Sequence, residues 1–497
     1  MAKAAATTAP PQTPTFTSGY KSLVLTLLVM VYTVNFIDRT IIGTIGQAIK
    51  LDLKLTDTQL GLLQGIAFAL LYTALGIPIA RLAERWNRVS IISICLVIWS
   101  GFTALCGIAG NFTQLMLYRV GVGIGEAGCS PPAHSLIADY YEPRRRATAL
   151  SIYSFGIPLG TMFGAVAGGW IAQHLSWRIA FMVVGVPGVI LAILMKLLVK
   201  EPPRGWSDRD SAVAADERPF VPDNTTAHAV HERQGQNWFT RELAELWKVA
   251  KLLFGKWSFL NMTIGVTLAS FAGYGAGGFI VPYFIRNFGL SLTVVGLIFG
   301  LIGGVANGAG TLLGGFITDR AAKRGEHWYA LVPAIGLAIA TPLYILVFMQ
   351  SDWKMAAALL LIPGIFHYTY LGPTFGVMHN LVQARQRATA TALLFFVLNL
   401  IALGGGPPFT GWVIDQFATH LFAQHNLGSF FTLCPGGVGA KGVAAGIDAV
   451  CKASMAQGTR YGEIVTTLIY AWAALHYALG AIGLAKDLRA ARGGADR

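Results

Sequence analysis

The string RRRATA at residues 144–149 decides the fold, because the chain repeats it as RQRATA at residues 385–390. Each copy opens a long apolar stretch, and the two stretches end in Gly-Trp at residues 169–170 and 411–412. A second match lies at nearly the same spacing, where Ala83-Glu84-Arg85 corresponds to Thr318-Asp319-Arg320. Both offsets are about 240 residues and the copies run in the same direction, so the chain contains two similar halves. Parallel halves related by an axis along the membrane normal are typical of secondary transporters.

The composition places both halves in a membrane. The 497 residues are 54% hydrophobic and only 12% charged, and the mean hydropathy is +0.56. Soluble domains carry roughly twice that charged fraction. At ~25 residues for each crossing, twelve crossings use about 300 residues, which the chain can supply. These numbers exclude a disordered chain and a disulfide scaffold. The net charge is +13, but the sequence contains no basic soluble domain, so nucleic-acid binding is not expected.

We therefore predict an all-α polytopic membrane protein with twelve transmembrane helices in two pseudo-symmetric six-helix bundles. The N-terminal bundle is expected at 21–199 and the C-terminal bundle at 256–486. A disordered cytoplasmic tail is expected at 1–20 and a cytoplasmic tail at 487–497. A charged linker is expected at 200–255, and it ends in an amphipathic surface helix from Asn237 to Phe254. The expected spans are 21–47, 58–83, 88–110, 112–138, 147–173, 177–199, 256–285, 291–318, 327–350, 353–380, 388–417 and 462–486.

Basic residues in the short loops predict the orientation. Alternate loops are rich in Lys and Arg and the opposite loops are poor in them, a pattern that marks the cytoplasmic side. The rich loops contain Arg81, Arg85, Arg88, Arg144, Arg145, Arg146, Arg320, Lys323, Arg324, Arg385 and Arg387. Both termini and the linker are therefore expected in the cytoplasm. We also expect the chain to be a monomer in a bacterial inner membrane.

Asp38, Arg39, Arg119 and Glu126 lie well inside the expected spans of the first half, away from the span ends. A charge at the bilayer centre costs ~2.5–3.5 kcal/mol on insertion scales, so it marks either a partner or a transport pathway. Asp38 and Arg119 lie at matching depths, so Asp38 can pair with Arg119 or with Arg39 across a shared cavity. Arg119 and Glu126 are seven residues apart and face one way, with Glu126 deeper in the membrane. We predict Asp38 and Glu126 as proton-coupling acids; a structural ion-pair network without coupling is the alternative.

The junction after the second expected span resembles the signature G-x-x-x-D-R-x-G-R of the major facilitator superfamily. It reads ARLAERWNR at residues 80–88, and its echo GFITDR at 315–320 keeps the pattern better. The resemblance extends over essentially the whole chain and implies that Glu84, Arg85, Asp319 and Arg320 form a cytoplasmic gate. Ala80, Glu84 and Asn87 depart from the signature, while the acidic-basic pair is kept.

Two segments resemble the Spinster group of lipid transporters within that superfamily. They are NFIDR at residues 35–39 and RVGVGIGEA at 119–127. The resemblance implies proton-coupled exchange of lysolipid-type substrates, with Asp38, Arg39 and Glu126 in the functional positions. Organic-anion porters of the superfamily share a similar G-x-G-E-A string, so a small organic anion is the alternative substrate. A lipid sensor that does not transport, or a scramblase, is the second alternative.

The second half contains few charges in its expected spans, which suits a substrate with an anionic headgroup and an apolar tail. We predict that the substrate contacts Arg39, Arg119, Asn35, Tyr370 and Asn399. No enzyme motif, cofactor site or metal site is expected. Cys434 and Cys451 are the two cysteines outside the spans, in a long loop expected at 418–461 on the outer side. They are predicted to form a disulfide in an oxidising periplasm.

Overall fold

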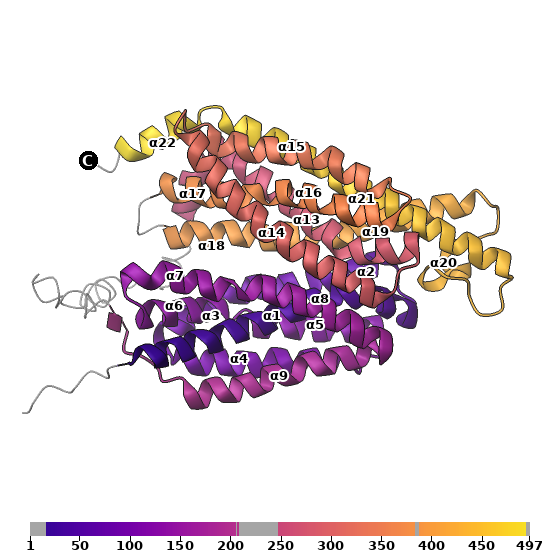
Figure 1. The fold of residues 1–497 in the computed structure, drawn as a ribbon, viewed down its shortest axis with the longest axis horizontal. Coiled ribbons are helices and arrows are strands. Elements are labelled where there is room, and N and C mark those ends of the chain that lie inside the picture. Colours follow the sequence, from indigo (N-terminus) through magenta and orange to yellow (C-terminus); the bar gives the residue numbers. More distant parts are fainter. Residues whose placement is uncertain (1–15, 205, 208–246, 383–386, 494–497) are drawn as a thin grey trace, which may run out of the picture.

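The computed structural model describes residues 16–204, 206–207, 247–382 and 387–493, and two bundles of helices account for most of them (Figure 1). We call α1 to α9 the first bundle and α13 to α22 the second bundle. The helices of the first bundle are α1 (Ser18–Leu53), α2 (Asp57–Gln64), α3 (Ile66–Arg85), α4 (Arg88–Cys106), α5 (Phe112–Glu126), α6 (Ser130–Tyr140), α7 (Pro143–Ser154), α8 (Gly156–His174) and α9 (Trp177–Leu198).

The second bundle repeats this order of elements. Its α-helices are α13 (Trp257–Phe288), α14 (Leu292–Ala322), α15 (Trp328–Phe348), α16 (Trp353–His367), α17 (Leu371–Leu381), α18 (Arg387–Val397), α19 (Gly404–Ala423), α20 (Phe430–Leu433), α21 (Ala445–Ala481) and α22 (Leu484–Gly493). Three short segments of other helical type join them: η1 (Tyr368–Tyr370), η3 (Leu398–Leu403) and η4 (Pro435–Gly437). Each bundle has its own apolar core of buried side chains.

Among the described residues, eleven segments are long and apolar enough to cross a membrane. The remaining crossing of the expected twelve is formed by α5 and α6, which the turn at residues 127–129 separates. Pro131 and Pro132 occupy the first turn of α6, where a missing backbone N–H does no harm. Arg119 and Glu126 lower the hydropathy of this crossing, and the helix is interrupted directly after Glu126.

Several crossings consist of two helices because local sequence interrupts the hydrogen-bond ladder. Gly65 joins α2 to α3 with φ −101° and ψ −96°, outside the helical region. The π-helical η3 precedes Pro407 and Pro408 of α19, and prolines cannot donate to the carbonyls one turn earlier. Pro158 lies two residues after the start of α8, and Pro407 lies three residues after the start of α19.

The two ends of the molecule differ. At one end, the Tyr20 hydroxyl of α1 donates to Leu198 O of α9, and Ser258 of α13 hydrogen-bonds to Asp487 of α22. We call this the terminal end; α22 and the junctions of α6 with α7 and α17 with α18 lie there in Figure 1. We call the opposite end, where α20 and η4 project, the loop end.

Some element boundaries differ from those expected. α19 continues to Ala423 and α21 begins at Ala445, so much of the expected loop at 418–461 is helical. The small and polar residues of 445–461 suited a loop by composition, but they build the part of α21 that extends to the loop end. The expected tails at 1–20 and 487–497 are also shorter, because α1 begins at Ser18 and α22 runs to Gly493.

The linker lies partly outside the described residues, which omit 208–246. Its start is fixed to the first bundle, where Arg204 donates to Ala83 O at 2.7 Å and Trp206 is buried. Of the expected amphipathic helix, residues 247–254 are described and helical. Val249 and Leu253 are buried there, whereas Trp247 is exposed, so one face of this segment packs against the protein.

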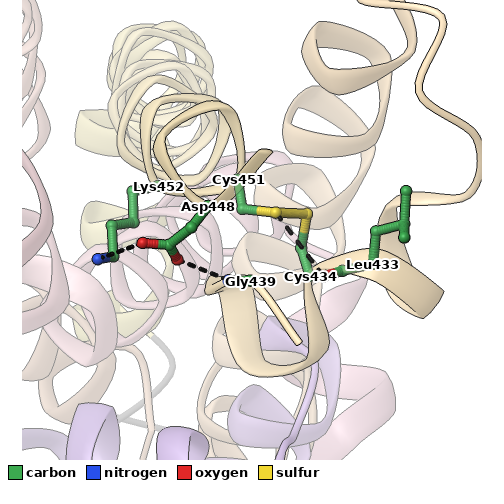
Figure 2. The surroundings of a disulfide bond; sticks show 6 residues. All are labelled: Leu433, Cys434, Gly439, Asp448, Cys451 and Lys452. Atoms are coloured by element: carbon green, nitrogen blue, oxygen red, sulfur yellow. Dashed lines mark hydrogen bonds and ion pairs between the residues drawn. A yellow bond between two sulfur atoms is a disulfide. The ribbon is translucent and has the colours of Figure 1, made fainter. Parts of the chain in front are cut away.

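The segment between α19 and α21, which we call the cap (residues 424–444), is joined to α21 by the disulfide Cys434–Cys451 (Figure 2). The two Cα atoms lie 5.5 Å apart. Asp448 of α21 accepts a hydrogen bond of 2.8 Å from the Gly439 N–H and pairs with Lys452 at 2.7 Å. A Cβ at Gly436 would lie 3.2 Å from Lys50 O, so the cap of the second bundle also touches the end of α1.

Small residues bring the two bundles into close contact at the loop end. A Cβ at Gly296 of α14 would lie 2.4 Å from Ala165 O of α8, and a Cβ at Gly411 of α19 would lie 2.1 Å from Asp57 O of α2. Neither distance leaves room for a side chain. Glycine is therefore required where α8 meets α14 and where α2 meets α19.

We predict that Gly296→Ala lowers stability by roughly 1–3 kcal/mol, because the added methyl group forces α8 and α14 apart. Gly303→Ala on the same helix is the matched control, since a Cβ there meets nothing within 4 Å. The control should be neutral or up to about 1 kcal/mol stabilising, from helix propensity alone. Thermal unfolding in detergent measures both; equal melting temperatures for the two variants would contradict the close contact.

We predict that Cys451→Ser loosens the cap, because the disulfide closes a segment with a sequence separation of 17. A loop of this length contributes about 3 kcal/mol in the chain-entropy account. Limited proteolysis should cut the variant within 424–444 much faster than the native chain, and reductant should reproduce the effect in the native chain. Peptide mass spectrometry without reductant that finds two free thiols would exclude the disulfide.

Candidate functional site

Asp38 and Arg119 form a buried ion pair inside the first bundle. Arg119 Nη1 of α5 lies 3.3 Å from Asp38 Oδ1 of α1, and both residues are 1% exposed. The Thr103 hydroxyl of α4 donates to Asp38 Oδ2 at 2.5 Å. Three helices thus surround one carboxylate, which matches the pairing of Asp38 with Arg119 that the residue depths suggested.

Arg39 and Glu126 form a second pair beside the first. Arg39 Nε donates to Glu126 Oε2 at 2.7 Å, and the other carboxylate oxygen is buried without a hydrogen-bond partner among the described residues. The Glu126 side chain is fully buried, but 25% of the Arg39 side chain is exposed. The guanidinium lies over the rings of Tyr72, Phe68 and Phe36, at 4.7, 4.8 and 5.3 Å from their centroids.

The helices explain why neighbouring residues play different parts. Asp38 and Arg39 are adjacent on α1 and so point about 100° apart, one into the bundle and the other toward its surface. Arg119 and Glu126 are two turns apart on α5, so one face of α5 supplies a partner both to Asp38 and to Arg39. A Cβ at Gly123, between them, would lie 2.6 Å from Phe68 O, so glycine lets α3 approach this face.

Asn35 lies one turn before Arg39 on α1. It is 1% exposed, and neither atom of its amide has a hydrogen-bond partner among the described residues. A buried amide without partners costs free energy, so this position favours a polar ligand or water.

The expected substrate residues of the second bundle are less accessible. Tyr370 is 4% exposed, and its hydroxyl lies 3.0 Å from Ser270 Oγ. Asn399 is half-buried on the π-helical η3. Tyr274 of α13 is 45% exposed and lies within electrostatic range of Arg39 and Tyr72 of the first bundle. Tyr274 is therefore a second-bundle side chain within electrostatic range of the Arg39 pair.

A buried aromatic cluster lies behind Tyr370. The His367 ring lies 3.3 Å from the hydroxyls of both Tyr344 and Tyr470. His367 also stacks between neighbours, with its ring centroid 4.4 Å from that of Tyr368. These polar groups satisfy one another and hold α15, α16 and α21 together.

A charged network joins the two bundles at the loop end. We call it the loop-end network and define it as Lys50, Asp57, Thr58, Arg286 and Asp415. Arg286 of α13 binds both carboxylate oxygens of Asp57 at 2.7 and 2.8 Å, and Lys50 lies 2.8 Å from the same carboxylate. Both side chains that pair with Asp57 are nearly fully buried.

Asp415 completes the loop-end network by capping a helix of the other bundle. Its carboxylate on α19 accepts hydrogen bonds from the backbone N–H groups of Asp57 and Thr58 at 3.0 and 2.8 Å, and from the Thr58 hydroxyl at 2.6 Å. These N–H groups begin α2, where an anion is favoured by the helix dipole. The first turn of α2 is therefore completed by the second bundle.

The residues expected to form a cytoplasmic gate lie apart at the terminal end. Glu84 pairs with Arg81 of its own helix at 3.2 Å, and Arg85, Asp319 and Arg320 are exposed. Arg88, the last residue of the signature, is buried instead. It lies 2.5 Å from Asp139 of α6 and 2.6 Å from Glu201 of the linker, so this arginine fixes the linker to the bundle.

Sequence reasoning missed three important charges: Asp57, Arg286 and Glu463. Asp57 and Arg286 lie at the ends of short connections in the sequence, where a charged residue is ordinarily solvated. The one local signal is the capping box that Thr56 forms with Gln59, which marks Asp57 as the first residue of a helix. Glu463 is the second residue of the last expected span (462–486). In the structure α21 already begins at Ala445, so Glu463 lies inside this helix, where it is fully buried. Glu463 is one of the few buried charges of the second half, and the sequence did not single it out.

The geometry suits the exchange of ionic partners. Two acids and two arginines neutralise one another in the first bundle, and Arg39 alone of these four is substantially exposed. An anion that reaches Arg39 can compete with Glu126 for the guanidinium. In this arrangement an incoming anion and the Glu126 carboxylate compete for the same guanidinium, so that one negative group can replace the other.

Comparisons with known proteins agree with this architecture. A family model described as the Major Facilitator Superfamily matches residues 28–405, and the chain belongs to this family. The structure of a bacterial homologue of the human lysosomal transporter Spinster, in an inward-facing and unoccupied conformation, matches with a TM-score of 0.82 and 34% identity. The match covers 95% of this chain and 99% of that chain.

Two curated relatives extend the comparison. An MFS-type efflux pump of Mycolicibacterium smegmatis is 33% identical over 80% of this chain and 85% of its own length. The sphingosine-1-phosphate transporter SPNS2 of Xenopus tropicalis is 26% identical over 81% of this chain and 76% of its own length. The chain is thus a transporter of the Spinster type and not an enzyme, as the motifs at 35–39 and 119–127 indicated.

We predict that Asp38→Asn costs about 3–5 kcal/mol of stability at neutral pH, because it leaves the buried Arg119 guanidinium without a counter-ion. Glu84→Gln breaks an exposed pair whose glutamate side chain is 60% exposed, and it should cost no more than ~1 kcal/mol. Thermal unfolding in detergent compares the two. If Asp38→Asn matches the native chain, Asp38 does not act as the counter-ion of Arg119.

Proposed function

We propose that this protein is a proton-coupled, alternating-access transporter of an amphipathic anionic lipid of the lysophospholipid or sphingolipid type. The observation that carries the proposal is the Arg39–Glu126 pair, in which a partly exposed guanidinium neutralises a fully buried carboxylate. The relationship to SPNS2, which is named for a phosphorylated lipid, supports the substrate class.

The coupling follows from charge balance. When an anionic headgroup takes Arg39, Glu126 loses its counter-ion in a buried site whose second oxygen already has no donor among the described residues. A carboxylate in such surroundings is stabilised by a proton. Binding of the anion and protonation of Glu126 therefore favour each other, and Asp38 is the second acid that responds when Arg119 moves.

The proposed substrate site uses both bundles. Arg39 receives the headgroup, and Asn35, whose amide has no partner among the described residues, lies one turn away. Tyr370 and Asn399 contact the substrate from the second bundle, with Tyr274 nearest to Arg39. Arg119 takes part through Asp38, because its guanidinium is already paired with that carboxylate at 3.3 Å inside the first bundle.

We propose that the terminal end faces the cytoplasm of a bacterial inner membrane and that this conformation faces inward. The loop-end network and the close contacts of α2 with α19 support closure of the opposite side. Exposed Arg85, Asp319 and Arg320 support an open cytoplasmic side. In the opposite conformation these residues and Glu84 approach one another and form the gate. One chain contains both bundles, so a monomer suffices.

Two other functions remain testable. A small organic anion such as a sugar acid would use Arg39 in the same way and would need no acyl chain. A scramblase or a lipid sensor would keep the fold but would not accumulate substrate against a gradient.

We predict that an imposed pH gradient drives uptake of labelled lysophospholipid into proteoliposomes containing the native chain. Glu126→Gln should abolish the response to the gradient, because a permanently neutral side chain cannot take or release a proton. Exchange without a gradient should persist in this variant. Arg39→Gln should weaken substrate binding itself and so reduce both reactions.

The controls separate the alternatives. A labelled sugar acid replaces the lipid in parallel vesicles, and uptake of that compound alone would leave the fold but overturn the lipid proposal. Counterflow against a lipid gradient excludes a scramblase, which only dissipates gradients. Gradient-driven uptake that survives Glu126→Gln would overturn the role of Glu126.

A further inference from the structure

Glu463 is a buried acid that neither the Arg39 pair nor the Arg119 pair uses. It lies on α21 of the second bundle at 0% exposure, and both of its carboxylate oxygens lack a hydrogen-bond partner among the described residues. An ionised carboxylate without donors in such a place costs many kcal/mol, so the carboxyl group is uncharged in this arrangement. A buried carboxyl group that stays uncharged in this way holds a proton.

The groups around Glu463 come from every helix that packs against this part of α21. The hydroxyl of Tyr283 on α13 and that of Tyr344 on α15 lie within electrostatic range of it, and α21 itself adds Tyr470. Arg460 of α21 acts on Tyr283. On α19, Ile414 contacts Gly462 and Thr410 bonds to Thr466, so apolar and hydroxyl groups face it from that side. The cation that acts on Glu463 electrostatically is Arg286 of α13.

Thr459 connects Glu463 to the loop-end network. Arg286 Nη1 donates to the Thr459 hydroxyl at 2.8 Å. Thr459 and Glu463 are four residues apart on α21, so they share a face about 6 Å apart along the helix. A rotation of the long Arg286 side chain about its stem therefore carries the guanidinium from Asp57 toward Glu463.

Charge balance gives this rotation a reason. In the closed loop end, Lys50 and Arg286 neutralise Asp57 and Asp415, so an ionised Glu463 would be in excess. If the bundles separate at this end, Lys50 and Asp57 stay together because α1 and α2 belong to the first bundle. Arg286 leaves with the second bundle and has lost the two oxygens that held it at 2.7 and 2.8 Å.

We propose that Glu463 is a proton-binding site of the second bundle, and that its ionised form takes Arg286 from Asp57 when the loop end opens. The carboxyl O–H bond breaks, the proton passes to water that enters at the opened end, and the carboxylate accepts the guanidinium N–H groups. Reprotonation returns Arg286 to Asp57 and closes the loop end. This inference rests on the alternating access proposed above, and it adds a proton site far from the Arg39–Glu126 pair.

The test measures opening of the loop end in the full chain, without lipid and without a pH gradient. Spin labels are placed at Leu175→Cys after α8 and Met349→Cys after α15, two exposed positions at this end. Cys434 and Cys451 remain in their disulfide, and Cys95, Cys106 and Cys129 are buried. Distance distributions are recorded between acidic and alkaline pH for the native chain, Glu463→Gln and Asp448→Asn, the last being a matched acid-to-amide change on the same helix.

We expect the open population of the native chain to rise with pH and the rise in Glu463→Gln to be at least about two-fold smaller. Asp448→Asn should behave like the native chain. Arg286→Gln removes the partner, so adding Glu463→Gln to that variant should change the pH response no further. Glu463→Gln should also fold normally, because the proposal holds that the side chain is already uncharged in the closed state.

Three results would overturn the proposal. An unchanged pH response in Glu463→Gln would show that Glu463 does not exchange its proton during opening. An equal effect of Glu463→Gln with and without Arg286 would remove the partner exchange. A variant that fails to fold would mean that the ionised carboxylate is needed in the closed state. Failure of lysophospholipid uptake leaves all three results unaffected, so the two proposals can fail separately.

Discussion

The carboxylate of Asp57 is the group on which the closed arrangement of the two bundles depends. It stands at the first residue of α2, binds Lys50 from its own bundle and receives two hydrogen bonds from Arg286 of the other. The same turn of α2 is capped by Asp415 from the second bundle. A helix start that needs a partner bundle to satisfy its N–H groups exists in full only while the bundles are together. Packing follows, since Gly411 and Gly61 let α2 lie directly against α19.

Apolar packing reinforces this charged contact. Leu60 of α2 belongs to a buried cluster with Phe279, Ile414 and Phe422 of the second bundle, which extends to the disulfide of the cap. Each bundle keeps its own core when the two separate, whereas this smaller cluster must be exposed or rearranged. The loop end therefore combines ion pairs with a modest apolar contact. Because each bundle has its own core, such a contact suits the alternating access proposed above, in which it would open without either bundle unfolding.

The sequence predicted well those features that depend on spacing within one half. Asp38 and Arg119 pair as their depths suggested, and the repeats at 144 and 385 correspond to the junctions that begin α7 and α18. Periodicity and hydropathy act over a few turns, so they report which helices exist and which residues share a depth. The Cys434–Cys451 disulfide belongs to the same class of inference, because the two cysteines lay close together outside the spans.

Contacts between the halves could not be predicted in this way. Asp57 and Arg286 are separated by 229 residues, and each looks like a solvated residue of a short loop until the fold brings them together. Glu463 was hidden because the polar start of α21 resembles a loop by composition. Glu84 and Asp319, the proposed gate residues, lie apart in this structure, and a pairing that would exist only in another conformation cannot be read from one sequence. The sequence therefore leaves open the ion pairs between the two halves, which are the pairs that would change during the proposed transport cycle.

Buried charges in a membrane restrict how such a protein can move. No charged group in the interior can lose its partner unless another partner or a proton replaces it, because the alternative costs several kcal/mol for each group. Arg39 and Arg286 satisfy this condition in different ways: Arg39 is partly exposed beside a buried glutamate, and Arg286 stands between Asp57 and Glu463. In the cycle proposed above, Arg39 exchanges Glu126 for an anionic headgroup and Arg286 exchanges Asp57 for Glu463. Each proposed exchange links the arrangement of the bundles to the protonation of a glutamate. A transporter of this kind changes conformation through steps that keep each interior charge paired, and those steps determine where protons must enter and leave.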